Sequence, residues 1–211
     1  MSSPQHPFAQ SAYQVRFEWG VEGLARLAAS DVVVVVDVLR FSSTVIQALE
    51  RGETMATDAA SRAVSINGVA VAEAADGVVL LGALRNASAV ADAVLAEQER
   101  RGARTSVAVI AAGELTSREP GAPLRFAVED LFGAGAIIAA LSDRGIDHSS
   151  PEAAAAGEAF RPLGGAMRHL LTASGSGREL ADRIDEVHAA AAVDASSVVP
   201  VLQDGVFVPL G

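Results

Sequence analysis

Five consecutive valines at residues 32–36 are the most restrictive feature of this sequence. Because β-branched side chains alternate between the two faces of a strand, residues 31–38 are predicted to form a strand buried on both sides, as in a parallel sheet. An amphipathic stretch at residues 45–51 follows after a short polar turn. This stretch predicts a helix, with Ser42 or Ser43 as its N-cap.

The same alternation of apolar strands and amphipathic helices repeats along the first two thirds of the chain. Strands are predicted at residues 13–19, 31–38, 77–82 and 105–112. Helices are predicted at residues 21–30, 45–51, 86–101 and 127–141, with a proline-containing loop at 113–126. Strands that alternate with helices indicate βαβ units. We therefore predict an α/β fold, with a mostly parallel or mixed sheet flanked by helices.

The pattern changes after residue 145. Residues 151–193 contain successive alanine-rich helical stretches, and residues 196–210 have the pattern of a terminal strand pair or edge. This indicates a helix-rich C-terminal third. A chain of 211 residues is expected to form one domain, 1–211, and the alternative is a division into two lobes, 1–145 and 146–211.

Composition excludes several classes of function. All 16 cationic residues are arginine, there is no cysteine, and the formal net charge is −10. Lysine nucleophiles, thiolate chemistry, disulfides and cysteine-ligated metals are therefore ruled out. The acidity argues against binding to nucleic acid or to an anionic membrane surface. No apolar run approaches the ~20 residues of a membrane span and no secretory signal is apparent, so we expect a cytoplasmic protein.

The strongest candidate site follows the valine strand. In open α/β sheets, ligands bind beyond the carboxyl ends of the strands, where helix N-termini offer free N–H groups. Asp37 and Arg40 fall at that edge, and Ser42, Ser43 and Thr44 add three hydroxyls. Together they are suited to bind an oxyanion and to hold Mg²⁺ on its far side. The alternative interpretation is an N-cap pair beside a surface ion pair.

Two adjacent carboxylates open the helix that is predicted after the proline-containing loop. Glu129 and Asp130 either complement the helix dipole or supply a hard oxygen ligand to a divalent cation. Mg²⁺ usually takes only one or two protein carboxylates and keeps its waters. The four histidines are scattered, at positions 6, 148, 169 and 188, and do not have the spacing of metal ligands.

Several segments, in order along the chain, resemble the 2-phosphosulfolactate phosphatase family (ComB-like). They are DVLRFSSTVIQAL (37–49), VLLGALRNASAVADAV (79–94), VAVIAAG (107–113), AVEDLFGAGAII (127–138) and SGSGRELADRIDEVHAAAAVDASSVVPVLQDGVF (174–207). The resemblance implies an α/β fold, a Mg²⁺ requirement and hydrolysis of a phosphate ester on a small sulfonated acid. Some members of this family serve coenzyme M synthesis.

The expected roles follow from these residues and the resemblance. Asp37 is expected to be a metal ligand or the nucleophile, and Glu129 a second ligand or the general base, with Asp130 beside them as a metal ligand. Arg40, Ser42, Ser43 and Thr44 are expected to clamp the anion. Further substrate contacts are expected from Asn67, Gly68, Gly113, Ser174 and Gly175.

An alternative function comes from a departure from the family pattern. Between Thr54 and Ala63 the chain lacks the family's GE and G-N-S-P segment, and residues 65–69 keep only Asn-Gly of a threonine-rich stretch. A member without turnover, which binds an anionic metabolite or a protein partner, is the alternative. We also expect a homodimer, because the aromatic strand at 13–19 and the apolar C-terminus are suited to self-association.

Overall fold

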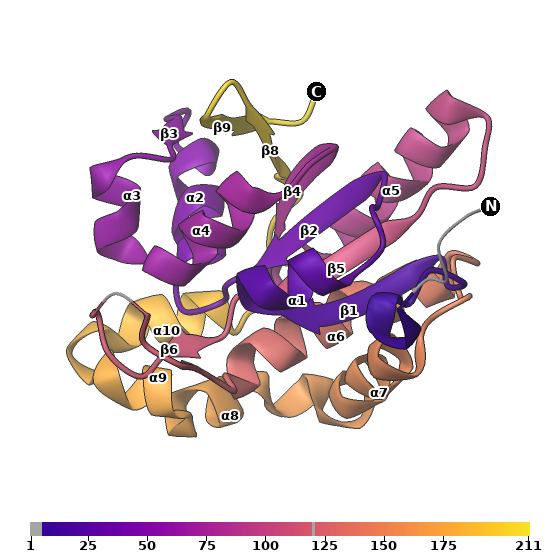
Figure 1. Cartoon of the computed structure of the whole chain (residues 1–211). Helices are drawn as coiled ribbons and strands as arrows, with labels where there is room; N and C mark the ends of the chain where they lie inside the picture. Colours follow the sequence, from indigo (N-terminus) through magenta and orange to yellow (C-terminus); the bar gives the residue numbers. More distant parts are fainter. Residues whose placement is uncertain (1–5, 120) are drawn as a thin grey trace.

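The computed structural model describes residues 6–119 and 121–211 and confirms an α/β fold (Figure 1). Residues 1–5, part of the N-terminal segment for which no secretory signal was predicted, lie outside the described residues. A seven-stranded mixed sheet has the order β1-β5-β2-β4-β8-β9-β3. Its strands are β1 (Val15–Trp19), β2 (Val32–Val36), β3 (Met55–Ala56), β4 (Val78–Gly82), β5 (Val107–Ala111), β8 (Pro200–Gln203) and β9 (Val206–Pro209).

The valine strand β2 lies inside the parallel part of the sheet. It pairs in parallel with β4 on one side and with β5 on the other, and β1 pairs in parallel with β5 at the edge. All five valines are buried, as their β-branched pattern predicts for a strand covered on both faces. The other three strands pair antiparallel and extend the sheet beyond β4.

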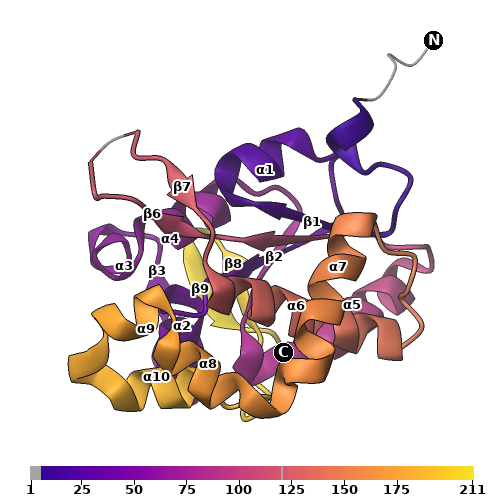
Figure 2. The ribbon, with the colours of Figure 1, turned by 90° about the horizontal axis from the view of Figure 1, so that it is seen from below.

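Helices cover both faces of the sheet (Figures 1 and 2). They are α1 (Gly20–Arg26), α2 (Phe41–Glu50), α3 (Ala59–Val64), α4 (Ile66–Ala74), α5 (Ala87–Arg101), α6 (Val128–Asp143), α7 (Pro151–Phe160), α8 (Met167–Ala173), α9 (Gly175–Glu179) and α10 (Ile184–Ala190). Short 3₁₀ turns occur at Pro7–Ala9, Leu84–Asn86, Arg161–Ala166 and Ala181–Arg183. None of the helices in the described residues is long and apolar enough to span a membrane.

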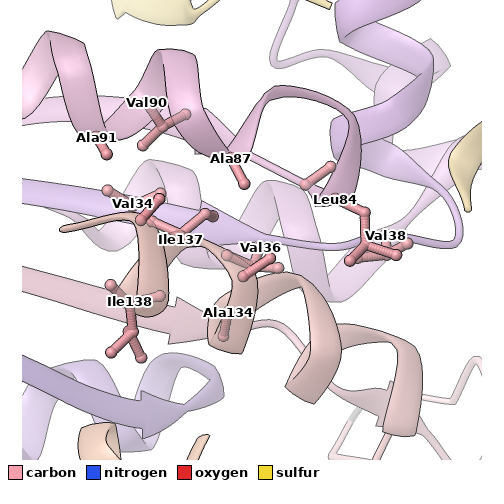
Figure 3. Packing of buried hydrophobic residues seen from close by; sticks show 14 of the residues in the cluster. Val34, Val36, Val38, Leu84, Ala87, Val90, Ala91, Ala134, Ile137 and Ile138 are labelled. Atoms are coloured by element: carbon pink, nitrogen blue, oxygen red, sulfur yellow. The ribbon is translucent and has the colours of Figure 1, made fainter. Parts of the chain in front are cut away.

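Alternate side chains of β2 belong to two separate apolar clusters. Val33 and Val35 pack with residues of α2 and α4. Val34 and Val36 pack with residues of α5 and α6 in the larger cluster (Figure 3). This cluster also contains residues of α7, α8 and α10. Ile137 of α6 is fully buried there, so truncation to alanine would cost about 2–5 kcal/mol.

Helix α6 lies unusually close to the carboxyl end of β2. A Cβ atom at Gly133 would stand 2.5 Å from Cγ2 of Val38 and 2.9 Å from Cγ1 of Val36. Only a glycine permits this approach without displacing the valines. The close packing brings the first turn of α6, with its two carboxylates, against the end of the strand.

Three local predictions were wrong. The helix predicted at residues 45–51 begins at Phe41, and its N-cap position is Arg40 rather than Ser42 or Ser43, because the Asp37 carboxylate accepts the N–H of Phe41. The loop predicted at 113–126 contains a small antiparallel ladder of β6 (Glu114–Leu115) and β7 (Leu124–Arg125). The helix predicted at 21–30 ends at Arg26, since Leu27 turns to extended backbone.

Candidate active site

A polar cleft of about 390 Å³ opens at the carboxyl ends of β2 and β5. These strands lead to α2 and α6, which cover opposite faces of the sheet, and ligands in open α/β sheets bind at such a point. Figure 2 shows α3, α4, β6 and α9 on one side of the molecule, around this edge. The polar lining includes Asp37, Arg40, Ser65, Asn67, Glu114 and Arg118.

Asp37 is the carboxylate at the base of this cleft, directly after β2. It is 3 % exposed, and its Oδ1 accepts the N–H of Phe41 at 3.0 Å. The Ser65 hydroxyl donates to its Oδ2 at 2.6 Å. Burial raises the pKa of Asp37 above its ordinary value, and the two hydrogen bonds work against this because they favour the charged form.

The start of α4 is shaped to fit against Asp37. Ser65 is the N-cap of this helix and accepts the N–H of Gly68. A Cβ at Gly68 would stand 2.5 Å from Oδ2 of Asp37 and about 3 Å from the Phe41 ring. The missing side chain of Gly68 therefore lets the helix end, and with it the Ser65 hydroxyl, reach the carboxylate.

Asp130, in the first turn of α6, holds two turns of the site together. Its Oδ1 accepts the N–H of Val38 at 2.7 Å, and its Oδ2 accepts the N–H of Gly113 at 2.9 Å. These donors follow β2 and β5, so one carboxylate bridges the two strand ends. Burial, together with the negative charges of Asp37 and Glu129, raises the pKa of Asp130 well above its ordinary value.

Glu129 is the buried carboxylate without a hydrogen-bond partner. It is 2 % exposed, and within residues 6–119 and 121–211 no group donates a hydrogen bond to it. Its negative charge contributes to the raised pKa of both Asp37 and Asp130. Glu129 does not line the cleft, and a cation bound between it and Asp37 would relieve the repulsion among these carboxylates.

The number of ligands that the protein itself offers is small. In the described parts of the chain, no three acidic or histidine side chains form a group suited to a metal ion. Asp37 and Glu129 thus remain as two carboxylate donors, while both oxygens of Asp130 already accept backbone N–H groups. Mg²⁺ commonly takes one or two carboxylates and completes its shell with water and substrate oxygens.

Two arginines among the described residues line the cleft, and they are held differently. Arg40 forms an ion pair with Glu186, with 3.3 Å between Nη1 and Oε2. Arg118, in the connection between β6 and β7, donates from Nη2 to the carbonyl oxygen of Ala63 at 3.1 Å. No carboxylate of the described residues pairs with Arg118.

A third acidic side chain lines the cleft opposite the turn after β2. Glu114, at the start of β6, accepts a hydrogen bond from the Ser176 hydroxyl at 3.3 Å. Partial burial raises the pKa of Glu114, and the negative charges of Asp37 and Glu179 raise it further. The interior of the cleft is therefore acidic. Binding of an anionic ligand depends on the few cationic side chains that line it.

The hydroxyls predicted to bind the anion point elsewhere. Ser42 donates to the carbonyl oxygen of Val35 and accepts the N–H of Asp37, and Ser43 donates to the carbonyl oxygen of Val38. Both serines are buried, and neither they nor Thr44 line the cleft. Their hydrogen bonds stabilise the turn that carries Asp37.

The remaining predicted residues lie near the cleft in different roles. Asn67 lines it, donates from Nδ2 to the carbonyl oxygen of Gly113 and thereby joins α4 to the end of β5. Ser174 caps α9 by accepting the N–H of Gly177, and Gly175 lies beside the Arg125 guanidinium. In α9 it is Ser176, two residues after this cap, that reaches the cleft.

The polar residues of the cleft that were not predicted from the sequence are Ser65, Glu114, Thr116, Ser117, Arg118, Ser176 and Glu179. Glu114 carries a usable signal, because it follows β5 just as Asp37 follows β2. Ser65 precedes an apolar helix as an N-cap residue would. Arg118 carries no such signal, since its approach to the cleft depends on the path of the β6–β7 connection.

Comparison with known protein families gives one match. The family model described as 2-phosphosulpholactate phosphatase matches residues 57–205, more than two thirds of the 211 residues. No curated protein matches the sequence. The matched range includes Ser65, Glu114 and both carboxylates of α6, and it begins after Asp37 and Arg40.

Proposed function

Because the chain belongs to the 2-phosphosulpholactate phosphatase family, we propose that it is a Mg²⁺-dependent phosphatase that hydrolyses a phosphoester of a small anionic sulfonate or carboxylate. For phosphosulfolactate, the products are sulfolactate and phosphate. One observation supports this most: buried Asp37 lines a polar cleft at the sheet edge and feels the charge of buried Glu129, whose oxygens accept no hydrogen bond from the described residues.

We assign the acidic residues as follows. Asp37 and Glu129 would hold Mg²⁺, and the bound ion would supply positive charge that stabilises the transferring phosphoryl group. Asp37 acts either as a ligand of that ion or as the nucleophile, and Glu129 as the second ligand or as the general base that activates water. Asp130 positions the backbone around them through its bonds to Val38 and Gly113.

Arg40 would bind the phosphoryl oxygens. It occupies the N-cap position of α2, so its guanidinium lies at the N-terminal end of this helix, where the helix dipole favours negative charge. Fixed donors that face developing negative charge stabilise a transition state. Ser42 and Ser43 contribute indirectly, by holding this turn in place.

The proposal is tested with a panel of phosphoesters and Mg²⁺. We expect phosphate release from 2-phosphosulfolactate or a related acid, and little from large or neutral alcohol phosphates, because the cleft is small and polar. A rise in the thermal midpoint with sulfolactate, without release of phosphate from any ester, would instead support a protein that binds such a metabolite without turnover.

We also propose a homodimer. Phe126 is 58 % exposed and contacts Trp19 at the end of the edge strand β1, and Leu124 is exposed beside them. A two-fold contact would cover this apolar patch on both copies. Light scattering should then give about twice the 21.5 kDa chain mass, and a constant monomer mass at high concentration would contradict the dimer.

A further inference from the structure

We propose that Arg118 determines specificity: its guanidinium binds the second acidic group of the substrate, the carboxylate or sulfonate that is not transferred. This inference rests on the proposed phosphatase function and adds the residue that distinguishes an acidic phosphoester from a simple one. It follows from the placement of Arg118 in the cleft, its hydrogen bond and the charges around it.

Arg118 reaches the cleft from a different wall than Arg40. It belongs to the connection between β6 and β7, whereas Arg40 follows β2. The bond from its Nη2 to the carbonyl oxygen of Ala63 attaches this connection to the end of α3. The guanidinium is thereby held beside the part of the cleft wall formed by residues 64–66.

The hydrogen bond to Ala63 leaves most of the guanidinium available. An arginine side chain offers five N–H donors in a planar fork, and one of them is used here. Such a fork matches two oxygens of a carboxylate or sulfonate. Thr116 and Ser117 line the cleft beside it and add hydroxyl groups to the same wall.

The charges in the cleft make Arg118 the cation that is available to a ligand. Arg40 pairs with Glu186 and is the residue we assign to the phosphoryl oxygens, and Asp37, Glu114 and Glu179 add negative charge to the lining. Arg118 has no carboxylate partner among the described residues. When the phosphoryl group of a substrate is bound near Asp37, Arg118 is therefore the cation that attracts the second acidic group of that substrate.

The test compares two substrates in the full-length protein with Mg²⁺. 2-Phosphosulfolactate carries the second acidic groups, and p-nitrophenyl phosphate does not. In Arg118→Gln, we expect the ratio of kcat/KM for the acidic ester to that for p-nitrophenyl phosphate to fall roughly tenfold, mainly through KM, as for one partly exposed charge-assisted contact. Arg118→Lys should recover part of the ratio, because it restores the charge without the planar fork.

Arg62→Gln is the matched control. Arg62 lies on the exposed side of α3, pairs with Glu73 and does not line the cleft, yet its loss removes the same charge near the same helix. This variant should keep the wild-type ratio. An unchanged ratio in Arg118→Gln, or an equal fall in both variants, would overturn the role of Arg118.

Failure of the phosphatase function would be recognised separately. If the wild-type protein releases no phosphate from either ester, calorimetric titration with sulfolactate replaces kinetics as the measurement. Binding that weakens roughly tenfold in Arg118→Gln and not in Arg62→Gln would uphold the anion contact without turnover. Equal affinity in all three proteins, or no binding to the wild type, would overturn it.

Discussion

Replacing Asp130 with asparagine should destabilise the protein, whereas the same replacement at Asp37 should not. The difference follows from the partners of the two carboxylates. Asp130 accepts from two backbone N–H groups, those of Val38 and Gly113. Asp37 accepts from one N–H group and from the hydroxyl of Ser65.

An asparagine has one oxygen and one NH₂ group, and this decides the outcome. At position 37 its oxygen still accepts from Phe41, and its NH₂ can donate to the Ser65 oxygen. At position 130 its NH₂ must face a backbone N–H, so one buried bond is lost without a substitute. A hydrogen bond to a charged group is worth about 1.5–3 kcal/mol.

The loss at position 130 is partly offset. Burial and neighbouring negative charge already raise the pKa of Asp130, so removal of its charge also removes an unfavourable interaction. We expect a net decrease of about 2 kcal/mol in the free energy of unfolding of Asp130→Asn. For a chain of this length that corresponds to a thermal midpoint lower by about 4–8 °C.

Denaturant unfolding of the wild type and both variants, in EDTA at neutral pH, measures this difference. The slope with denaturant concentration should stay the same in all three proteins, so that the midpoints report stability alone. If Asp130→Asn unfolds at the same midpoint as Asp37→Asn, the bridging role of Asp130 is refuted.

Three further predictions concern the same cleft. Gly68→Ala should cost about 1–3 kcal/mol, because its Cβ would press on Asp37, while Gly165→Ala, which has open space around it, should be neutral in the same unfolding assay. Glu114 has a raised pKa in the folded state, so folding favours its protonated form and the wild type should lose stability relative to Glu114→Gln as pH rises from 4.5. The opposite trend in unfolding midpoints across a pH series would contradict this. Addition of Mg²⁺ should raise the thermal midpoint of the wild type but not of Glu129→Gln, and equal shifts would exclude Glu129 as a ligand.

The parallel core of the fold was predictable from the sequence. The five valines of β2 and the apolar runs of β4 and β5 are signals of strands buried on both sides, and their ends located Asp37 correctly at the carboxyl edge. The helix pattern of α6 placed Glu129 and Asp130 in its first turn. These features depend on local periodicity, which a sequence displays directly.

The contacts inside the site were not predictable in the same way. Ser65 and Asp37 are 28 positions apart, and Asp130 and Val38 are 92 apart, so their hydrogen bonds depend on how distant segments pack. The hydroxyls of Ser42 and Ser43 were expected to face a ligand, but they donate to backbone carbonyl oxygens of β2 and of the turn after it. Tertiary structure therefore decided which polar groups face the cleft.

The most direct test of the central proposal is phosphate release from 2-phosphosulfolactate by the wild type and by Asp37→Asn. The asparagine oxygen can still accept from Phe41 and its NH₂ can donate to the Ser65 oxygen, so the variant should remain folded and its activity reports on chemistry. The proposal predicts Mg²⁺-dependent release by the wild type, its loss in EDTA, and at least a hundredfold lower rate in Asp37→Asn, of the order found when a catalytic group is removed. Full activity in the variant, or activity unchanged by EDTA, would contradict it.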